Sequence, residues 1–233
     1  MIEELDFETY LKISSTEFEI YLFDTNKHIN LYEQKYIFDN DNTIDFNSLD
    51  QFLEENIFKI EKLVGKFIRN ISLIIEINQI VKIDLGIKKK NYENSINKKI
   101  LENIVIEAKD IFNENYQQKK IMHIEITRYL INGKNYSSLS NNLNGENLCL
   151  EIQFRYIPFS FVNDIERILQ KYQIKISNYL DGDYIKSVFQ DIDVSLPIAS
   201  YKIIRGYNKN EVKIIPKNTK KTGFFVKFFQ LFS

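Results

Sequence analysis

Apolar and polar residues alternate at the start of the chain. The alternation runs from Tyr10 to Asp24 and is interrupted at Ser14-Ser15. A period of two predicts half-buried strands, so we expect two strands joined by a tight turn. A third strand is predicted over 31–38, before the turn-rich segment 39–42. The chain is therefore expected to begin with three antiparallel strands.

The period changes to that of a helix after residue 45. Apolar residues recur at three- and four-residue spacing from Phe46 to Ile68, and Asp45 or Asn47 is a suitable N-terminal cap. The short apolar run 71–75 follows and predicts a buried strand. Together these segments predict a crossover helix that leads into a fourth strand, parallel to the first.

The middle of the chain predicts a separate unit. Its expected elements are a strand over 80–87, a helix over 96–112, strands over 121–130 and 148–156, and a loop over 132–145. After Pro158 the first pattern resumes, with a helix over 161–169, a strand over 174–180, a helix over 184–189 and a last helix over 195–206. We therefore predict an α+β protein with one domain over 1–78 and 158–206, interrupted by an inserted domain over 79–157.

The C-terminal residues form two segments of different composition. Residues 207–222 are polar and rich in lysine, which predicts a linker. Residues 223–233 predict an amphipathic helix whose phenylalanines cost several kcal/mol if they stay in water, at about 1.5 to 3 kcal/mol for each large apolar side chain. Insertion into a membrane interface is one way to bury them, and docking on protein is the other. The expected membrane-binding residues are Phe224, Phe225, Val226, Phe228, Phe229, Leu231 and Phe232, with Lys220, Lys221 and Lys227.

Composition and charge narrow the possible functions. The 31 basic and 32 acidic residues of the 233 nearly cancel, so no global charge attracts nucleic acid. The one cysteine, Cys149, lies between two leucines and is expected in the core, which excludes a disulfide within the chain. The first residues lack the apolar core of a secretory signal, and no apolar run reaches the ~18 residues of a membrane span. We expect a cytoplasmic protein.

The first turn argues against nucleotide chemistry. Phosphate-binding turns use glycine, because a backbone without Cβ approaches phosphate closely, yet the turn Ile13–Glu17 contains no glycine and one acidic residue. A nuclease with a ribonuclease-H-like sheet needs metal-binding carboxylates on the first strand, where Lys12 and Ser14 stand instead. We therefore expect no catalytic, cofactor-binding or metal-binding residue here.

Three other patterns could carry chemistry, and each also has a structural interpretation. His123 and Glu125 share a strand face but have no third metal ligand in view, so a solvated strand face is expected. Asp181-Gly182-Asp183 lacks the other ligands of a calcium loop and is expected to cap a helix. Lys88-Lys89-Lys90 is expected to be a solvated loop cluster, since only Tyr92 is available to stack on a base.

The order of these elements resembles the bacterial FtsA family, actin-like proteins that tether the division ring to the membrane. Residues 10–18 look like the family's first strand and phosphate turn with its glycine replaced. Further similar segments are 105–109 in the helix of the inserted domain, 122–124 with 129–131 in the next strand, and 165–176 in the following helix and strand.

The resemblance also shows what this chain lacks. After Phe189 the family continues into a second actin-like half, whereas here Leu196–Tyr201 already looks like the family's last core helix. Most of the ATP site and the FtsZ-binding surface would be lost, so neither ATP hydrolysis nor FtsZ contact is carried over. The membrane anchor over 224–232 is retained, and so is the inserted domain that meets other cell-division proteins in the family.

The sequence therefore supports two functions. The first is a non-enzymatic, FtsA-like tether or scaffold on the inner face of the cytoplasmic membrane, with other cell-division proteins as partners and no nucleic acid. The second is a soluble adaptor or dimerisation module whose phenylalanine-rich tail packs on a partner protein.

Overall fold

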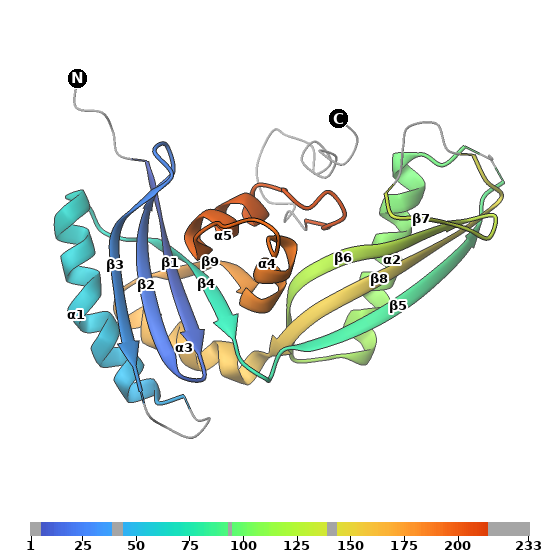
Figure 1. Ribbon diagram of the computed structural model, residues 1–233. Helices are drawn as coiled ribbons and strands as arrows, with labels where there is room; N and C mark the ends of the chain where they lie inside the picture. Colours follow the sequence, from blue (N-terminus) through green and yellow to red (C-terminus); the bar gives the residue numbers. More distant parts are fainter. Residues whose placement is uncertain (1–5, 39–43, 93–94, 139–143, 214–233) are drawn as a thin grey trace. The chain divides into compact units, whose positions relative to one another are not determined.

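The chain divides into two compact units (Figure 1). The computed structural model describes residues 6–38, 44–92, 95–138 and 144–213. Unit 1 combines Met1–Ile80 with Ile157–Arg205, and unit 2 combines Val81–Tyr156 with the chain from Gly206 onward. Val81–Tyr156, the larger part of unit 2, is thus inserted between the two parts of unit 1.

Unit 1 is built on a five-stranded sheet with the order β3-β2-β1-β4-β9. Its strands are β1 (Phe7–Ser14), β2 (Glu17–Asp24), β3 (Ile29–Ile37), β4 (Asn70–Glu76) and β9 (Lys175–Asp181). β1, β2 and β3 pair antiparallel, whereas β4 pairs parallel with both β1 and β9. The carboxyl ends of β1, β4 and β9 therefore meet at one edge of the sheet, next to the β1–β2 turn.

Helices cover both faces of this sheet (Figure 1). On one face α1 (Phe46–Val64) and α3 (Phe159–Lys171) pack together, and Phe46 contacts Phe161. On the other face α4 (Gly182–Val188) and α5 (Leu196–Ile204) cover a core that includes Tyr10 and Tyr184. The Asp45 side chain caps α1 by accepting from the Asn47 amide, which confirms the predicted start of this helix.

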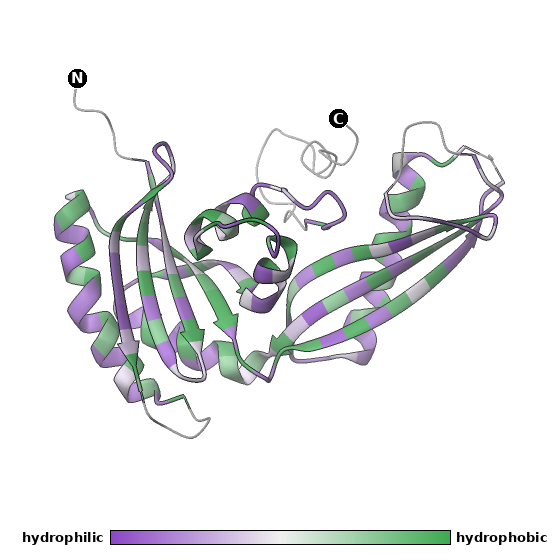
Figure 2. Cartoon of the chain, in the orientation of Figure 1, coloured by the Kyte–Doolittle hydropathy of each residue, from purple (hydrophilic) through white to green (hydrophobic). Residues whose placement is uncertain are grey.

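Unit 2 has a four-stranded sheet with the order β5-β8-β6-β7. Its elements are β5 (Val81–Lys90), α2 (Lys98–Asn115), β6 (Lys119–Ile131), β7 (Lys134–Tyr136) and β8 (Asn147–Pro158). Hydrophobic and hydrophilic residues alternate along its long strands, as Figure 2 shows. The apolar face packs against α2, where the ring of Phe112 stacks on Phe154 with centroids 4.8 Å apart.

The segment predicted as a loop over 132–145 contains a further strand. β7 pairs with the end of β6 through a two-residue turn in which Asn132 and Gly133 have φ angles of 49° and 80°. Asn-Gly is the preferred pair for a type I′ hairpin turn, because both central residues need positive φ. The sequence therefore held a signal for this hairpin.

The first residues of the predicted polar linker pack on unit 2. β7 is too short to cover the whole edge of β6, and residues 210–212 pair with part of what remains: the Val212 amide donates to Ile124 O at 2.7 Å, and the Ile126 amide donates to Asn210 O at 2.9 Å. Val212 is buried in the core of unit 2. The linker prediction is wrong for 207–213. The polar composition of this segment gave no sign that Val212 is buried or that the segment pairs with the free edge of β6.

The rest of the predicted linker and the helix predicted over 223–233 lie outside the described residues. This includes every residue predicted to bind a membrane. Within the described part of the chain, no helix is long and apolar enough to cross a membrane.

Candidate functional site

The turn between β1 and β2 lies at the sheet edge where the parallel strands end. The Ser14 Oγ accepts hydrogen bonds from the amides of Thr16 at 3.2 Å and Glu17 at 3.0 Å. The same hydroxyl donates to the Glu17 carbonyl at 3.2 Å. Backbone amides are the groups that bind phosphate in a nucleotide-binding turn. Here two of them are already bonded to the buried side chain of Ser14.

Three lysines and three glutamates surround this turn. We call them the hairpin cluster: Lys12, Glu17, Glu19, Lys35, Glu76 and Lys186. The Lys12 ammonium lies 2.6 Å from Glu17 Oε1, 3.4 Å from Glu19 Oε2 and 3.7 Å from Glu76 Oε2. Lys35 pairs with Glu17 and Glu19, and Lys186 lies 2.7 Å from Glu76 Oε2. The charges of the hairpin cluster therefore balance.

Burial makes this cluster energetically important. Only 9% of the Lys12 side chain is exposed, against 44% for Lys35. Burial opposes the charge of Lys12, but the hydrogen bond to Glu17 and the nearby Glu76 and Glu19 raise its pKa above the usual value. Burial likewise opposes the charge of Glu17, and hydrogen bonds from Lys12 and Lys35 outweigh it and lower its pKa to about 2. Both groups are therefore charged at neutral pH.

Glu76 and Gly182 are in close contact at the ends of β4 and β9. A Cβ placed on Gly182 would lie 2.3 Å from Glu76 Cγ, so the glycine makes room for this glutamate. The neighbouring Asp181 side chain accepts from the amides of Asp183 and Tyr184. This confirms the prediction that Asp181-Gly182-Asp183 caps a helix. Glu76 Oε1 is buried and has no hydrogen-bond partner among the described residues.

The predicted solvated strand face around His123 is wrong. His123 is 2% exposed, and its Nδ1 lies 2.6 Å from Glu211 Oε1. Glu125 Oε1 accepts from the side-chain Nδ2 of Asn208 at 2.8 Å, so both side chains face the segment that follows Gly206. Sequence reasoning missed Glu211, because the partner lies 88 residues away in a segment of linker composition. In the described part of the chain no three His, Cys, Asp or Glu residues gather in a way that could hold a metal ion.

The other candidates lie on β5 and β8. Cys149 is half-buried rather than in the core, because it faces the opposite side of β8 from the fully buried Leu148 and Leu150. The three lysines 88–90 belong to β5 rather than to a loop. Lys89 pairs with Glu107 at 2.6 Å, and Lys90 lies over the ring of Tyr92 at 5.4 Å. These residues belong to unit 2, whereas the hairpin cluster belongs to unit 1.

The fold has solved counterparts of low sequence identity. The PilM-PilN type IV pilus biogenesis complex matches 78% of this chain and 49% of that chain, with 10% identity and a TM-score of 0.51. Weaker matches are the cytoplasmic domain of EpsL, an inner membrane component of the type II secretion system of Vibrio cholerae, and a Bacteroides thetaiotaomicron protein with an actin-like ATPase fold and unknown function. For EpsL the identity is 6%, the coverage 77% of this chain and 57% of that chain, and the TM-score 0.37. For the Bacteroides protein the identity is 13%, the coverage is 82% of this chain and 60% of the Bacteroides chain, and the TM-score is 0.34.

These matches concern the fold alone. The chain is a mixed α+β protein whose fold is similar to that of a chain in the PilM-PilN complex, and it spans about half the length of that chain. No family model matches the sequence, and no curated protein matches it. The narrower relation to the FtsA family is not established by these matches.

Proposed function

We propose that this chain is a non-enzymatic, FtsA-like scaffold that acts on the inner face of the cytoplasmic membrane. The observation that carries the proposal is the β1–β2 turn, where an actin-like sheet has two turn amides bonded to Ser14. In support, the fold is similar to that of a protein in the PilM-PilN pilus biogenesis complex. Unit 2 is the part that would contact other cell-division proteins, and contact with FtsZ is not part of the proposal.

The proposal includes the loss of ATP binding. A triphosphate would have to displace Ser14 from the turn amides and would meet the carboxylates of Glu17, Glu19 and Glu76. The hairpin cluster offers no net positive charge in return. Mg²⁺-ATP at millimolar concentration is therefore expected to leave the thermal unfolding midpoint of the full chain unchanged. A ligand at 100 times its Kd stabilises by about 2.7 kcal/mol, so a rise of several degrees would contradict the loss of ATP binding.

The proposed membrane anchor is the C-terminal tail, 223–233. As a helix, it would place phenylalanines on one face and Lys227 and Gln230 on the other, with Lys220 and Lys221 just before it. Apolar insertion combined with lysines near anionic headgroups is the two-part signal that gives stable interfacial binding. The tail would thus bring the scaffold to the membrane without a spanning helix.

A matched pair of variants tests the anchor. Phe228→Glu and Gln230→Glu each add one negative charge to the tail of the full chain, on opposite faces of the proposed helix. In co-sedimentation with anionic vesicles, we expect Phe228→Glu to lower the vesicle partition coefficient at least about tenfold, because a large apolar side chain contributes about 1.5 to 3 kcal/mol. Gln230→Glu should bind nearly as well as the wild type.

The second function is a soluble adaptor whose tail packs on a partner protein. The similarity to a chain in a protein–protein complex favours this alternative. If the wild-type chain stays in the supernatant with every vesicle composition, the adaptor function replaces the tether. If Phe228→Glu sediments as well as Gln230→Glu, the tail is not the anchor.

A further inference from the structure

The second half of α1 exposes large apolar side chains to solvent. Phe58 is 70% exposed, Leu63 is 60% exposed, and Phe67, which follows the helix, is 73% exposed. Such side chains cost free energy in water, and neighbouring ones mark an interaction surface. We call the surface formed by Phe58, Lys59, Lys62, Leu63, Lys66 and Phe67 the α1 patch.

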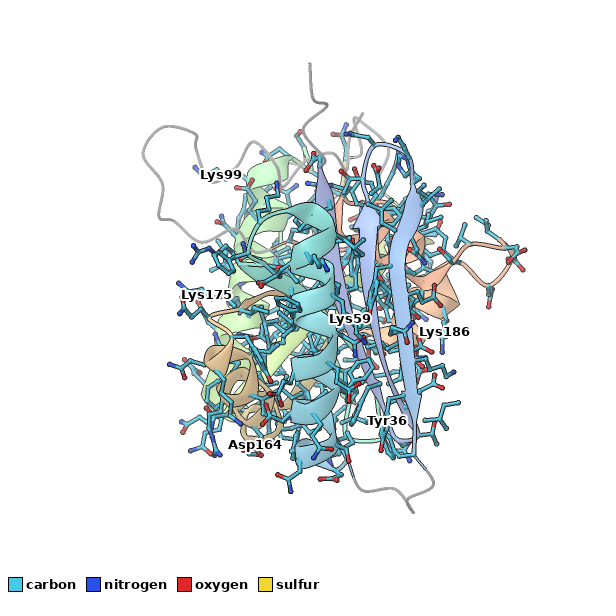
Figure 3. The ribbon with its side chains drawn as sticks, turned by 90° about the vertical axis from the view of Figure 1, so that its left-hand side faces the viewer. Tyr36, Lys59, Lys99, Asp164, Lys175 and Lys186 are labelled. Carbon is cyan, nitrogen blue, oxygen red and sulfur yellow. The ribbon has the colours of Figure 1, made fainter. Side chains whose placement is uncertain are left out.

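The exposed residues share one side of the helix. At 100° per residue, Phe58, Lys59, Lys62 and Leu63 lie within one arc, and the buried Ile57 and Ile60 lie outside it. In Figure 3, where α1 faces the viewer, Lys59 is labelled on this helix. Gly65 ends α1 with a φ of 69°. Lys66 and Phe67 directly follow it and are exposed as well.

The α1 patch is basic, and its lysines form no ion pair within the described part of the chain. Residues 58–69 contain four basic residues and one acidic residue, Glu61, although the whole chain has a net charge of −1. Glu61 is turned inward and accepts from the Ile68 amide at 3.0 Å. Among the described residues, no carboxylate forms an ion pair with Lys59, Lys62 or Lys66, and Lys66 lies over the ring of Phe7 at 4.8 Å.

Two further cations and two hollows border the α1 patch. Arg69 has no ion pair in the described chain, and its carbonyl accepts from the amide of Lys175, which is also unpaired there. Phe67 and Arg69 line both a pocket of about 530 Å³ and a second pocket of about 320 Å³. The surface thus combines exposed apolar groups, adjacent hollows and cations that form no ion pair in the described chain.

We propose that the α1 patch binds the surface of an anionic phospholipid membrane, as a second contact within the folded part of the chain. The chemistry favours lipid over a protein partner. Protein interfaces are depleted in lysine, whereas three of the six residues here are lysines, whose long stems let the ammonium reach headgroups while Phe58, Leu63 and Phe67 enter the interface. The inference deepens the proposed function and rests on it for the presence of a membrane.

The absence of tryptophan allows a local test. The sequence contains no tryptophan, so Phe67→Trp in the full chain places the only tryptophan in the α1 patch, where it can be excited selectively over the tyrosines. With vesicles that contain phosphatidylglycerol, its emission is expected to shift to the blue and to be quenched by brominated lipid chains. The matched control is Tyr92→Trp, at a position that is 84% exposed and also lies near lysines, but in unit 2. The emission of this control should not change.

Charge reversal supplies the second measurement. Lys59→Glu, Lys62→Glu and Lys66→Glu together are expected to lower the vesicle partition coefficient of the full chain about 100-fold, since each lysine near an anionic surface contributes about fivefold. The control is the triple variant Lys82→Glu, Lys88→Glu and Lys134→Glu, which makes the same change of net charge in unit 2. These three lysines are exposed and form no ion pair within the described chain. It should lose much less affinity. Circular dichroism checks that each variant is folded.

The outcomes separate this inference from the proposed function. If the Phe67→Trp chain sediments with vesicles while its fluorescence emission stays unchanged, the α1 contact is overturned and the tail remains as anchor. Equal losses for the two sets of lysine reversals would also overturn it, because the effect would then follow net charge alone. A blue shift of the Phe67→Trp emission that persists in the Phe228→Glu background would support the α1 contact even if the tail fails as an anchor. The inference would also be overturned if the Phe67→Trp emission shifted on addition of an acidic protein but not on addition of vesicles.

Discussion

Lys12→Ala is expected to lower the free energy of unfolding by about 3 kcal/mol, at the lower end of the range for breaking a buried ion pair. The variant leaves Glu17, Glu19 and Glu76 without their buried cation, although Lys35 and Lys186 still reach them. Chemical denaturation monitored by circular dichroism measures the loss as a lower midpoint with an unchanged slope.

Lys35→Ala is the matched control for this loss. It removes an ammonium from the same two glutamates, but from a side chain that is 44% exposed. Exposed ion pairs contribute little to stability, so Lys35→Ala should lower the free energy of unfolding much less than Lys12→Ala. Equal losses for both variants would show that Lys12 does not hold the hairpin cluster together.

The pH dependence of stability gives an independent check on the Lys12 variant. The pKa of Glu17 is lowered to about 2 in the folded chain, whereas that of a glutamate in the unfolded chain is near 4.3. This difference stabilises the folded chain at pH values above about 4.3. This stability is lost as the pH falls from about 4.3 towards 2, because the unfolded chain takes up the proton first. Lys12→Ala raises the Glu17 pKa by removing one hydrogen bond, so the acid-dependent part of its stability should be smaller than in the wild type.

The periodic elements could be predicted from the sequence because their burial is regular. The apolar stripe of α1 occurs at helical spacing, and Asp45 and Gly65 mark its two ends. The strands of unit 1 are likewise predicted from alternation and from the short apolar run of β4. For α1 and β4 the local pattern and the tertiary burial agree, whereas the polar positions of β1 and β2, such as Lys12 and Glu19, are buried instead of exposed.

The candidate site could be predicted only in part, because its chemistry depends on pairing between distant residues. The missing glycine in the β1–β2 turn is visible in the sequence, but the pairing of Lys12 with Glu76 needs the parallel alignment of β1 and β4. The contact of His123 with Glu211 requires a segment of polar composition to pair with the edge of β6. No local pattern encodes either contact.

Phe112→Ala is expected to lower the stability of unit 2 by about 3 to 5 kcal/mol, the usual cost of removing a fully buried aromatic ring. Phe112 has no exposed surface, and its ring lies 4.8 Å from Phe154, 5.1 Å from Tyr116 and 5.3 Å from Tyr156. All of these rings belong to unit 2. Hydrogen exchange measured by mass spectrometry should therefore show faster exchange in peptides of 81–156, while peptides of β1 and α1 keep their protection.

Ile106→Ala is the control on the same helix, since Ile106 is 47% exposed and its truncation should cost no more than about 0.5 kcal/mol. The comparison decides whether unit 2 is an independent module, as an inserted interaction domain would be. Its apolar core consists of residues of its own sheet, of α2 and of Val212, so the packing that is lost lies within unit 2. If Phe112→Ala also exposed the amides of β1 and α1 to exchange, the two units would unfold as one, and a scaffold with a separable partner-binding domain would be ruled out.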